Sequence, residues 1–243
     1  MLTKCRAIVI KCIDYSETSV ILKCFTDVYG MQSYLINGVR KNKGSIRPSQ
    51  LQPLTILELE AYHQQNKNLQ RIKELKCTPQ LNTLHFNMFK SAIGMFMAEV
   101  IYRSIKEENQ PDTNLFEYLN STIQILDMEQ ERTANYPLFF LINLSRFLGF
   151  YPKLNSNGTT TMGFNFRDGE FEPYDDKNPF QIDLVSSQLL IELMRCTYDE
   201  QKIMQIHGQH RKQLIQALVL YYNQHLSGFS NMRSHEILAE VLE

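Results

Sequence analysis

Hydrophobic and polar positions follow two different patterns along this chain, and the change falls near Pro79. In the first part, short runs rich in Ile, Val, Leu and Tyr are interrupted by polar turns such as Asp14-Tyr15-Ser16-Glu17. Five short strands in this part favour a small closed barrel over an open sheet, whose edges would invite aggregation. The last run stays ambiguous, because Leu69, Ile72 and Leu75 also have helical spacing. The predicted strands cover residues 5–13, 18–25, 31–36, 54–61 and 69–77.

Beyond Pro79, apolar residues recur with the period of an α-helix. The first predicted helix is apolar on several faces, so we expect it to be central and mostly buried. The third should point Phe140, Leu144 and Phe147 inward and stop at Gly149. The predicted helices cover residues 84–102, 115–126, 136–147, 186–196 and 211–225.

Between the helices, residues 151–182 are poor in aliphatic side chains. Met162, Phe164 and Phe166 alternate with polar neighbours, and Asp168-Gly169 is a hairpin turn signal. The fold class is therefore α+β, a barrel domain over 1–79 followed by an α-helical domain over 80–243. A small hairpin insertion at about 151–182 belongs to the second domain.

Composition places the chain among ordinary globular proteins, with 43% hydrophobic and 21% charged residues in 243. No run approaches the roughly 18 apolar residues of a membrane span, and nothing resembles a signal peptide, so we expect a cytoplasmic protein without a membrane partner. The five cysteines are scattered and form no CxxC pair, which favours free thiols over a zinc knuckle or a disulfide framework.

Charge is distributed unevenly between the two parts. Residues 1–80 carry a net charge of +6 and residues 81–243 a net charge of −7. Within the first part, a glycine-bounded stretch over 38–48 is strongly basic, and such a loop can follow a phosphate backbone with sequence-tolerant, salt-sensitive affinity. The alternative is a solvated turn between two strands. The cations of this stretch are Arg40, Lys41, Lys43 and Arg47.

Aromatic side chains in the first part are candidates for stacking on nucleic-acid bases. We expect Phe25 to fill the core, whereas Tyr15, Tyr34 and Tyr62 are candidates for exposure.

Motifs of catalysis or metal binding are weak in this sequence. His207 and His210 have an i, i+3 spacing, but no third ligand lies at a suitable distance, so a solvated or phosphate-facing helix start is the better interpretation. The sequence contains no phosphate loop, nucleophile elbow or HExxH motif, which argues against an enzyme.

Several strings of the first part occur together in a recognisable order. They are Ala7-Ile8-Val9-Ile10-Lys11, Phe25-Thr26-Asp27-Val28-Tyr29-Gly30 and Asn37-Gly38-Val39-Arg40-Lys41, followed by Leu51-Gln52-Pro53-Leu54. In this combination they resemble the RecO family of bacterial recombination mediators. In the helical part, Leu148-Gly149-Phe150-Tyr151-Pro152 is similar to the family's segment before its zinc module.

The resemblance implies an N-terminal OB-fold barrel that binds single- and double-stranded DNA and anneals complementary strands. It also implies partnership with RecR and help in loading RecA onto strands covered by single-strand-binding protein, whose acidic, hydrophobic C-terminal tail the family contacts. The DNA-binding residues that the resemblance implies are Arg40, Lys41, Lys43 and Arg47, and two further basic residues of the first part, Lys11 and Arg6, are added as candidates.

Docking of an acidic tail needs an apolar cleft with a cation at its lip. The candidates for that cation are four arginines on or beside apolar helices, each of which has the alternative of being a plain helix-surface residue. They are Arg103, Arg132, Arg146 and Arg195.

The chain departs from the family where many members place four zinc-binding cysteines, because residues 151–179 contain no cysteine. We therefore predict no metal and no cofactor, and an apolar cluster in place of the zinc site, made by Met162, Phe164, Phe166 and Phe171. Two other functions stay open: an OB-fold RNA-binding module and a non-catalytic protein-interaction scaffold. A nuclease is disfavoured by the lack of a convincing metal–carboxylate cluster.

Overall fold

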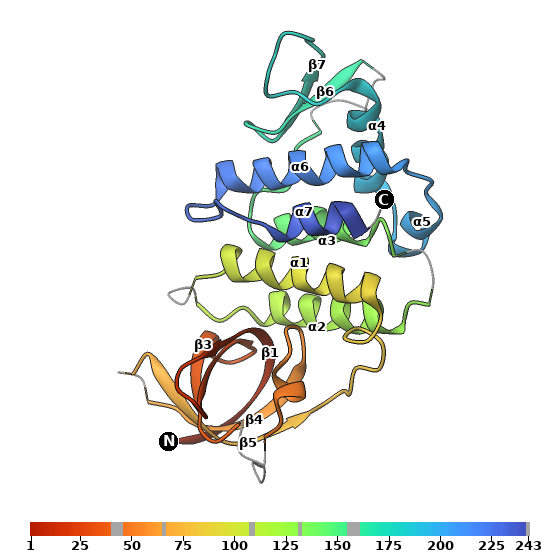
Figure 1. Cartoon of the computed structure of the whole chain (residues 1–243). Helices are drawn as coiled ribbons and strands as arrows, with labels where there is room; N and C mark the ends of the chain where they lie inside the picture. Colours follow the sequence, from red (N-terminus) through yellow and green to blue (C-terminus); the bar gives the residue numbers. More distant parts are fainter. Residues whose placement is uncertain (40–45, 65–66, 107–109, 131–132, 155–160, 242–243) are drawn as a thin grey trace. The chain divides into compact units, whose positions relative to one another are not determined.

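The five predicted strands are present and close into a barrel with the order β1-β2-β3-β5-β4 (Figure 1). The computed structural model describes residues 1–39, 46–64, 67–106, 110–130, 133–154 and 161–241. All pairings are antiparallel except that of β3 with β5, and the ambiguous last run is a strand. The strands are β1 (Leu2–Asp14), β2 (Val20–Thr26), β3 (Gly30–Ile36), β4 (Ile56–Tyr62) and β5 (Leu69–Cys77).

The long first strand closes the barrel because it pairs with two neighbours. Its first half pairs with β4 and its second half with β2, and a register shift between Val9 and Lys11 bends it where the partners change. Alternate residues such as Ala7, Val9 and Leu22 point into the barrel core. A short 3-10 helix, η1 (Pro48–Leu51), precedes β4 and adds the buried Leu51 to that core.

Two helices pack on the outside of the barrel. They are α1 (Met88–Ser104) and α2 (Thr113–Met128), and with the barrel they form one compact unit, Met1–Met128. The rings of Phe25 on β2 and Phe116 on α2 lie 6.2 Å apart between centroids. The segment that leads into α1 is held by the Asp127 carboxylate, which accepts the backbone N–H groups of Asn82, Thr83 and Leu84 at 2.7 to 3.1 Å.

The second compact unit, Glu129–Glu243, contains the remaining helices and a hairpin. Helix α6 packs against α3, α4 and α7, and buries Leu214, Leu218 and the rings of Tyr221 and Tyr222. The predicted domain boundary at residue 79 follows the end of β5, whereas the compact units divide after α2. The helices are α3 (Tyr136–Phe147), α4 (Leu184–Arg195), α5 (Tyr198–Ile203), α6 (Gly208–His225) and α7 (Ser234–Val241).

The predicted hairpin is β6 (Met162–Asn165) paired with β7 (Glu170–Pro173), and it lies against α4 (Figure 1). The Ser187 hydroxyl of α4 accepts the backbone N–H of Phe164 at 2.9 Å. Gly169, in the turn, has φ +73° and lies so close to the Tyr221 ring that an added Cβ would sit 2.6 Å from it. The turn therefore needs glycine both for its backbone conformation and for space.

Helix α1 starts at Met88 rather than at residue 84, and it is mostly buried as expected, since only Met88, Phe89 and Met95 of its 17 residues are exposed. The expectation of inward-pointing side chains is wrong for one residue of α3. Phe147 is 38% exposed, since it lies in the last turn of α3, whereas Phe140 and Leu144 are buried as predicted. Among the described residues, no helix combines the length and apolar character that a membrane crossing requires.

Candidate nucleic-acid interface

Two lysines lie directly opposite each other on the barrel surface. Lys11 of β1 and Lys23 of β2 are register partners, and their Nζ atoms lie 4.8 and 5.8 Å from the centroid of one ring, Tyr102 of α1. Opposed like charges destabilise a strand pair, but an aromatic face attracts both ammonium groups. This arrangement gathers two positive charges at one point of the barrel. The sequence named Lys11 but not Lys23 as a candidate, because only the register of β1 with β2 brings the two lysines together.

The basic loop is anchored to the barrel at both ends. On one side the backbone N–H of the buried Val39 donates to Thr18 at 2.9 Å, and on the other the core residue Leu51 ends η1. Arg47 is exposed just before η1, and its backbone N–H donates to the Gln50 side chain at 2.8 Å. Three predicted site residues, Arg40, Lys41 and Lys43, fall outside the described part of the chain.

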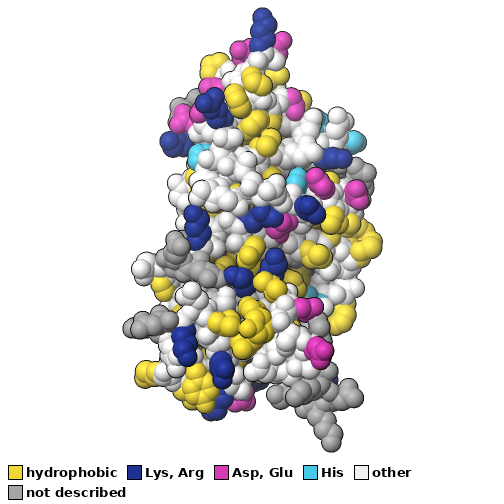
Figure 2. All heavy atoms as spheres, turned by 60° about the vertical axis from the view of Figure 1, so that its left-hand side comes forward, with side chains coloured by type: hydrophobic (Ala, Val, Ile, Leu, Met, Phe, Trp, Pro, Cys, Tyr) yellow, Lys and Arg dark blue, Asp and Glu magenta, His cyan; other side chains and the backbone are white. Residues whose placement is uncertain are grey.

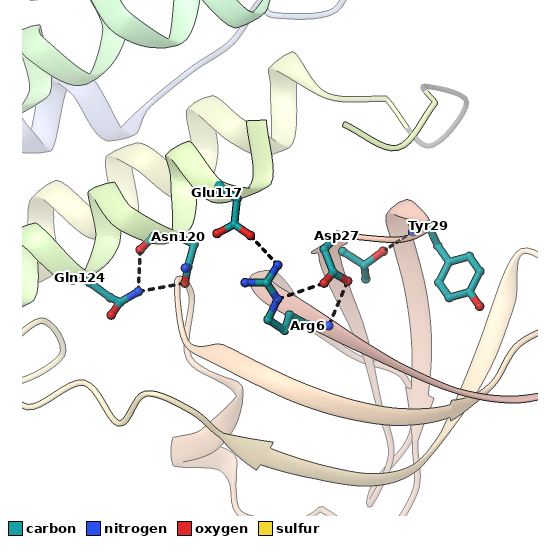
Figure 3. A network of polar contacts seen from close by, with 7 residues as sticks. Arg6, Asp27, Tyr29, Glu117, Asn120 and Gln124 are labelled. Carbon is teal, nitrogen blue, oxygen red and sulfur yellow. Dashed lines mark hydrogen bonds and ion pairs between the residues drawn. The ribbon is translucent and has the colours of Figure 1, made fainter. Parts of the chain in front are cut away.

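Arg6 is engaged by two carboxylates (Figure 3). Its guanidinium lies 3.0 Å from Asp27 and 2.5 Å from Glu117 of α2, and stands 4.9 Å from the Phe116 ring centroid. The hydrogen bond with Glu117 raises the pKa of Arg6, and Arg6 in turn lowers the pKa of Glu117. Arg6 therefore ties β1 to α2, and it would have to leave both carboxylates before contacting a phosphate.

A groove of about 550 Å³ opens beside Arg6, over β1, β4 and β5. Its lining includes three cations and four carboxylates, so this face of the barrel is poorly suited to a polyanion. The charged residues of the groove are Lys4, Arg6, Lys76, Asp27, Glu58, Glu60 and Glu74.

The candidate stacking residues have different surroundings. Tyr15 is 61% exposed in the β1–β2 turn and Tyr62 is 50% exposed at the end of β4. The expectation of exposure is wrong for Tyr34, which is buried in the barrel core, where desolvation raises its pKa. Phe25 is buried as predicted.

In the helical unit, Glu129–Glu243, hydrogen bonds through Tyr151 connect the helix ends that carry two of the four candidate arginines, Arg146 and Arg195. Arg146 donates to the Tyr151 hydroxyl at 2.8 Å and lies over its ring, with 4.2 Å to the centroid. That hydroxyl donates to the carbonyl of Met194, the residue before the exposed Arg195. Arg103, in the other unit, forms an ion pair with Glu99 at 2.7 Å, and Arg132 is not among the described residues.

The cysteine-free hairpin is held by aromatic side chains and by a polar network. Phe164 and Phe171 are buried with their centroids 5.1 Å apart, and Tyr221 of α6 lies 5.5 Å from Phe164. Phe166 instead pairs with Phe180 at 5.9 Å, so the predicted apolar cluster is divided in two. Glu172 accepts hydrogen bonds from three amide side chains, those of Asn165, Asn178 and Gln181.

His207 and His210, the histidine pair of the sequence, both make contacts that belong to the helices. His207 is the N-cap of α6, and His210 lies 3.2 Å from the Ser186 hydroxyl. Within the described ranges, no three His, Cys, Asp or Glu side chains gather as a metal site would require.

A closed five-stranded barrel of this strand order defines the OB-fold class, a class that includes many nucleic-acid-binding domains. Two family models match the chain, "Recombination protein O N terminal" over residues 1–80 and "Recombination protein O C terminal" over residues 85–234. The chain belongs to the recombination protein O (RecO) family.

Similar relatives carry the name DNA repair protein RecO. The protein of Flavobacterium psychrophilum is 34% identical over 242 residues, which is 99% of both chains. Those of Azobacteroides pseudotrichonymphae and Bacteroides fragilis are each 34% identical over the full length of both chains. The similarity therefore extends across the barrel and the helical unit alike.

Proposed function

We propose that this protein is a DNA-binding recombination mediator that acts in DNA repair. The observation that carries the proposal is the full-length similarity to relatives named DNA repair protein RecO, at 34% identity over 99% of the chain. In this role it binds single- and double-stranded DNA, anneals complementary strands, and works with RecR to help load RecA onto strands covered by single-strand-binding protein.

The barrel surface supplies a physical route to annealing. Phosphates at the opposed Lys11 and Lys23 would relieve the repulsion between the two ammonium groups, and Arg47 with the neighbouring basic loop would extend the contact. Cations that contact only the backbone leave base edges free, so a second strand can pair while the first is held. Neutralising the phosphates of both strands also lowers the repulsion that opposes their approach.

The helical unit is the proposed docking site for the tail of single-strand-binding protein. Arg146 and Arg195 are the best placed of the four candidates, because Tyr151 links the helix ends that carry them. Phe147 is partly exposed in the same turn as Arg146 and offers an apolar contact. A cation beside an exposed ring suits a tail that combines acidic and hydrophobic residues.

Binding of a fluorescent single-stranded DNA across a salt series tests the DNA-binding part. The test variant changes Arg40, Lys41, Lys43 and Arg47 to Glu. A matched control makes the same charge change at four exposed cations of the helical unit: Lys153, Arg167, Lys177 and Lys212. We expect steep salt dependence in the wild type, collapse of binding in the test variant, and wild-type affinity or a much smaller loss in the control.

Two results would overturn the proposal. Absence of wild-type binding at low salt would favour a protein-interaction scaffold instead. Preference for RNA in a competition between matched DNA and RNA strands would favour an RNA-binding module.

A further inference from the structure

A second aromatic and cationic surface lies at the turn between β4 and β5. A depression of about 380 Å³ is present there, lined by Tyr62, Gln64, Lys67, Leu69, Gln70 and Arg71. Unlike the larger groove beside Arg6, its lining among the described residues contains two cations and no carboxylate. Size alone would favour the groove as a ligand site, but charge favours this depression for an anionic ligand.

The register of the sheet places an aromatic ring beside a guanidinium. Tyr62 and Arg71 are direct partners across β4 and β5, and both are exposed. Leu2 of β1 pairs with Tyr62 on one side, and Leu35 of β3 pairs with Arg71 on the other. One row across four strands therefore combines a stacking face, a cation and partly exposed aliphatic side chains.

The cations of the depression are available to a ligand. Within residues 1–39, 46–64 and 67–106, neither Lys67 nor Arg71 forms an ion pair, whereas the nearby Lys73 is paired with Glu60 at 3.1 Å. Lys67 and Arg71 are both exposed.

The turn is held in shape by a buried amide. Gln70 is 2% exposed, and its side chain accepts the backbone N–H of Gln64 at 2.9 Å and donates to the carbonyls of Gln64 and Lys67 at 2.9 and 2.6 Å. Beside it, the His63 ring stacks on Tyr29 with 3.8 Å between centroids. The depression is thus formed before any ligand arrives, which lowers the entropy cost of binding.

We infer that this depression is a subsite for one unstacked base of single-stranded DNA, which stacks on Tyr62 while Lys67 and Arg71 contact the adjacent phosphates. The inference rests on the proposed function and adds a base-contacting position at the turn between β4 and β5.

Tryptophan fluorescence can detect the stacking directly, because the chain contains no Trp. Tyr62→Trp places a single reporter in the depression, and Tyr174→Trp places one at a 38% exposed site in the helical unit as a control. Titration with oligothymidylate should quench the emission at position 62 and leave position 174 unchanged. An abasic oligonucleotide of the same length should bind without quenching, since it offers phosphates but no ring.

Affinity measurements on side-chain variants provide an independent test. Tyr62→Ala should weaken binding of single-stranded DNA about ten-fold, within the range of one lost base–aromatic stack, and Tyr62→Phe should bind like the wild type. Changing Lys67 and Arg71 to Gln should reduce the slope of log affinity against log salt by about 1 to 2.

The outcomes separate this subsite from the proposed function. If Tyr62→Ala binds DNA like the wild type and Tyr62→Trp is not quenched, the subsite is refuted while salt-dependent binding by the wild type keeps the proposed function. If the wild type binds no DNA at all, both the subsite and the proposed function are refuted. Equal weakening by Tyr62→Phe and Tyr62→Ala would also refute stacking, because Phe keeps the ring.

Discussion

Replacing Asp127 with alanine tests what holds the segment between the barrel and α1 in place. The Asp127 side chain is buried at the end of α2 and accepts the backbone N–H groups of Asn82, Thr83 and Leu84. Each hydrogen bond to a charged group contributes at least ~1 kcal/mol net, so losing three should lower the free energy of unfolding by about 3 kcal/mol. The variant leaves the backbone carbonyl of residue 127, which binds Lys90, in place.

Urea unfolding followed by circular dichroism measures this loss. With a slope of about 2 kcal/mol per molar urea, the midpoint should fall by about 1.5 M. Hydrogen exchange of peptides that cover residues 78–87 should accelerate in the variant, which locates the effect without assuming that the two compact units unfold together. The control is Asp112→Ala at the other end of α2, where the carboxylate accepts the single N–H of Leu115 at 2.9 Å and the expected loss is about 1 kcal/mol.

The effect should depend on pH in a defined direction. Burial alone raises the pKa of Asp127, but the backbone donors outweigh it and hold the pKa below its ordinary value. A lowered pKa means that the ionised carboxylate stabilises the fold fully above the unfolded-state pKa of about 3.9, and that this stabilisation is lost as the pH falls through the lower folded-state pKa. The difference between wild type and variant should therefore be constant near pH 7 and shrink below about pH 4. A difference no larger than that of the control at pH 7, or one that grows on acidification, would refute the reasoning.

Three further predictions concern the helical unit. Phe164→Ala should lower the free energy of unfolding of that unit by about 3 to 5 kcal/mol, because the ring is fully buried. Phe166→Ala should lower it by clearly less, because Phe166 is only half-buried, and thermal unfolding of the two variants measures the difference. Metal analysis should find no stoichiometric zinc, and a chelator should leave the unfolding temperature unchanged, whereas one zinc per chain would contradict the aromatic hairpin core. An acidic peptide with apolar terminal residues should bind the Arg146→Glu, Arg195→Glu double variant at least ten-fold more weakly than wild type in a fluorescence titration, and Arg103→Glu should bind unchanged.

The barrel could be predicted from the sequence because each strand is a short apolar run bounded by turn residues. The run over 69–77 stayed ambiguous in the sequence because its apolar residues also have helical spacing, and the structure shows that it is a strand. The short helices α5 and α7 were missed, because six or eight residues give too few turns for a periodic pattern to stand out. The capping box of Thr197 and Glu200 was the one available signal for α5.

Burial of individual aromatic residues could not be predicted in the same way. Tyr34 and Tyr62 are both tyrosines in strands, yet one lies in the barrel core and the other on its surface. The difference depends on which side of the pleat each residue faces, and the register of β3 with its neighbours decides that. The prediction that Phe147 points inward is wrong for a related reason. Phe147 lies in the last turn of α3 and is partly exposed, whereas Phe140 and Leu144, earlier in the helix, are fully buried.

The positions of the charged side chains in the fold explain how a barrel with mixed charges can present a basic surface. The groove beside Arg6, together with the Lys73–Glu60 ion pair, accounts for four cations and four carboxylates of residues 1–80. The other eight cations of this part are accompanied in the sequence only by Asp14 and Glu17. The net charge of +6 therefore belongs to the remainder of the barrel, which includes the Lys11–Lys23 pair, the basic loop and the depression lined by Lys67 and Arg71. Since counterion release depends on the cations that meet phosphates, variants of this remainder should change the salt dependence of DNA binding, and variants of the groove lysines Lys4 and Lys76 should not.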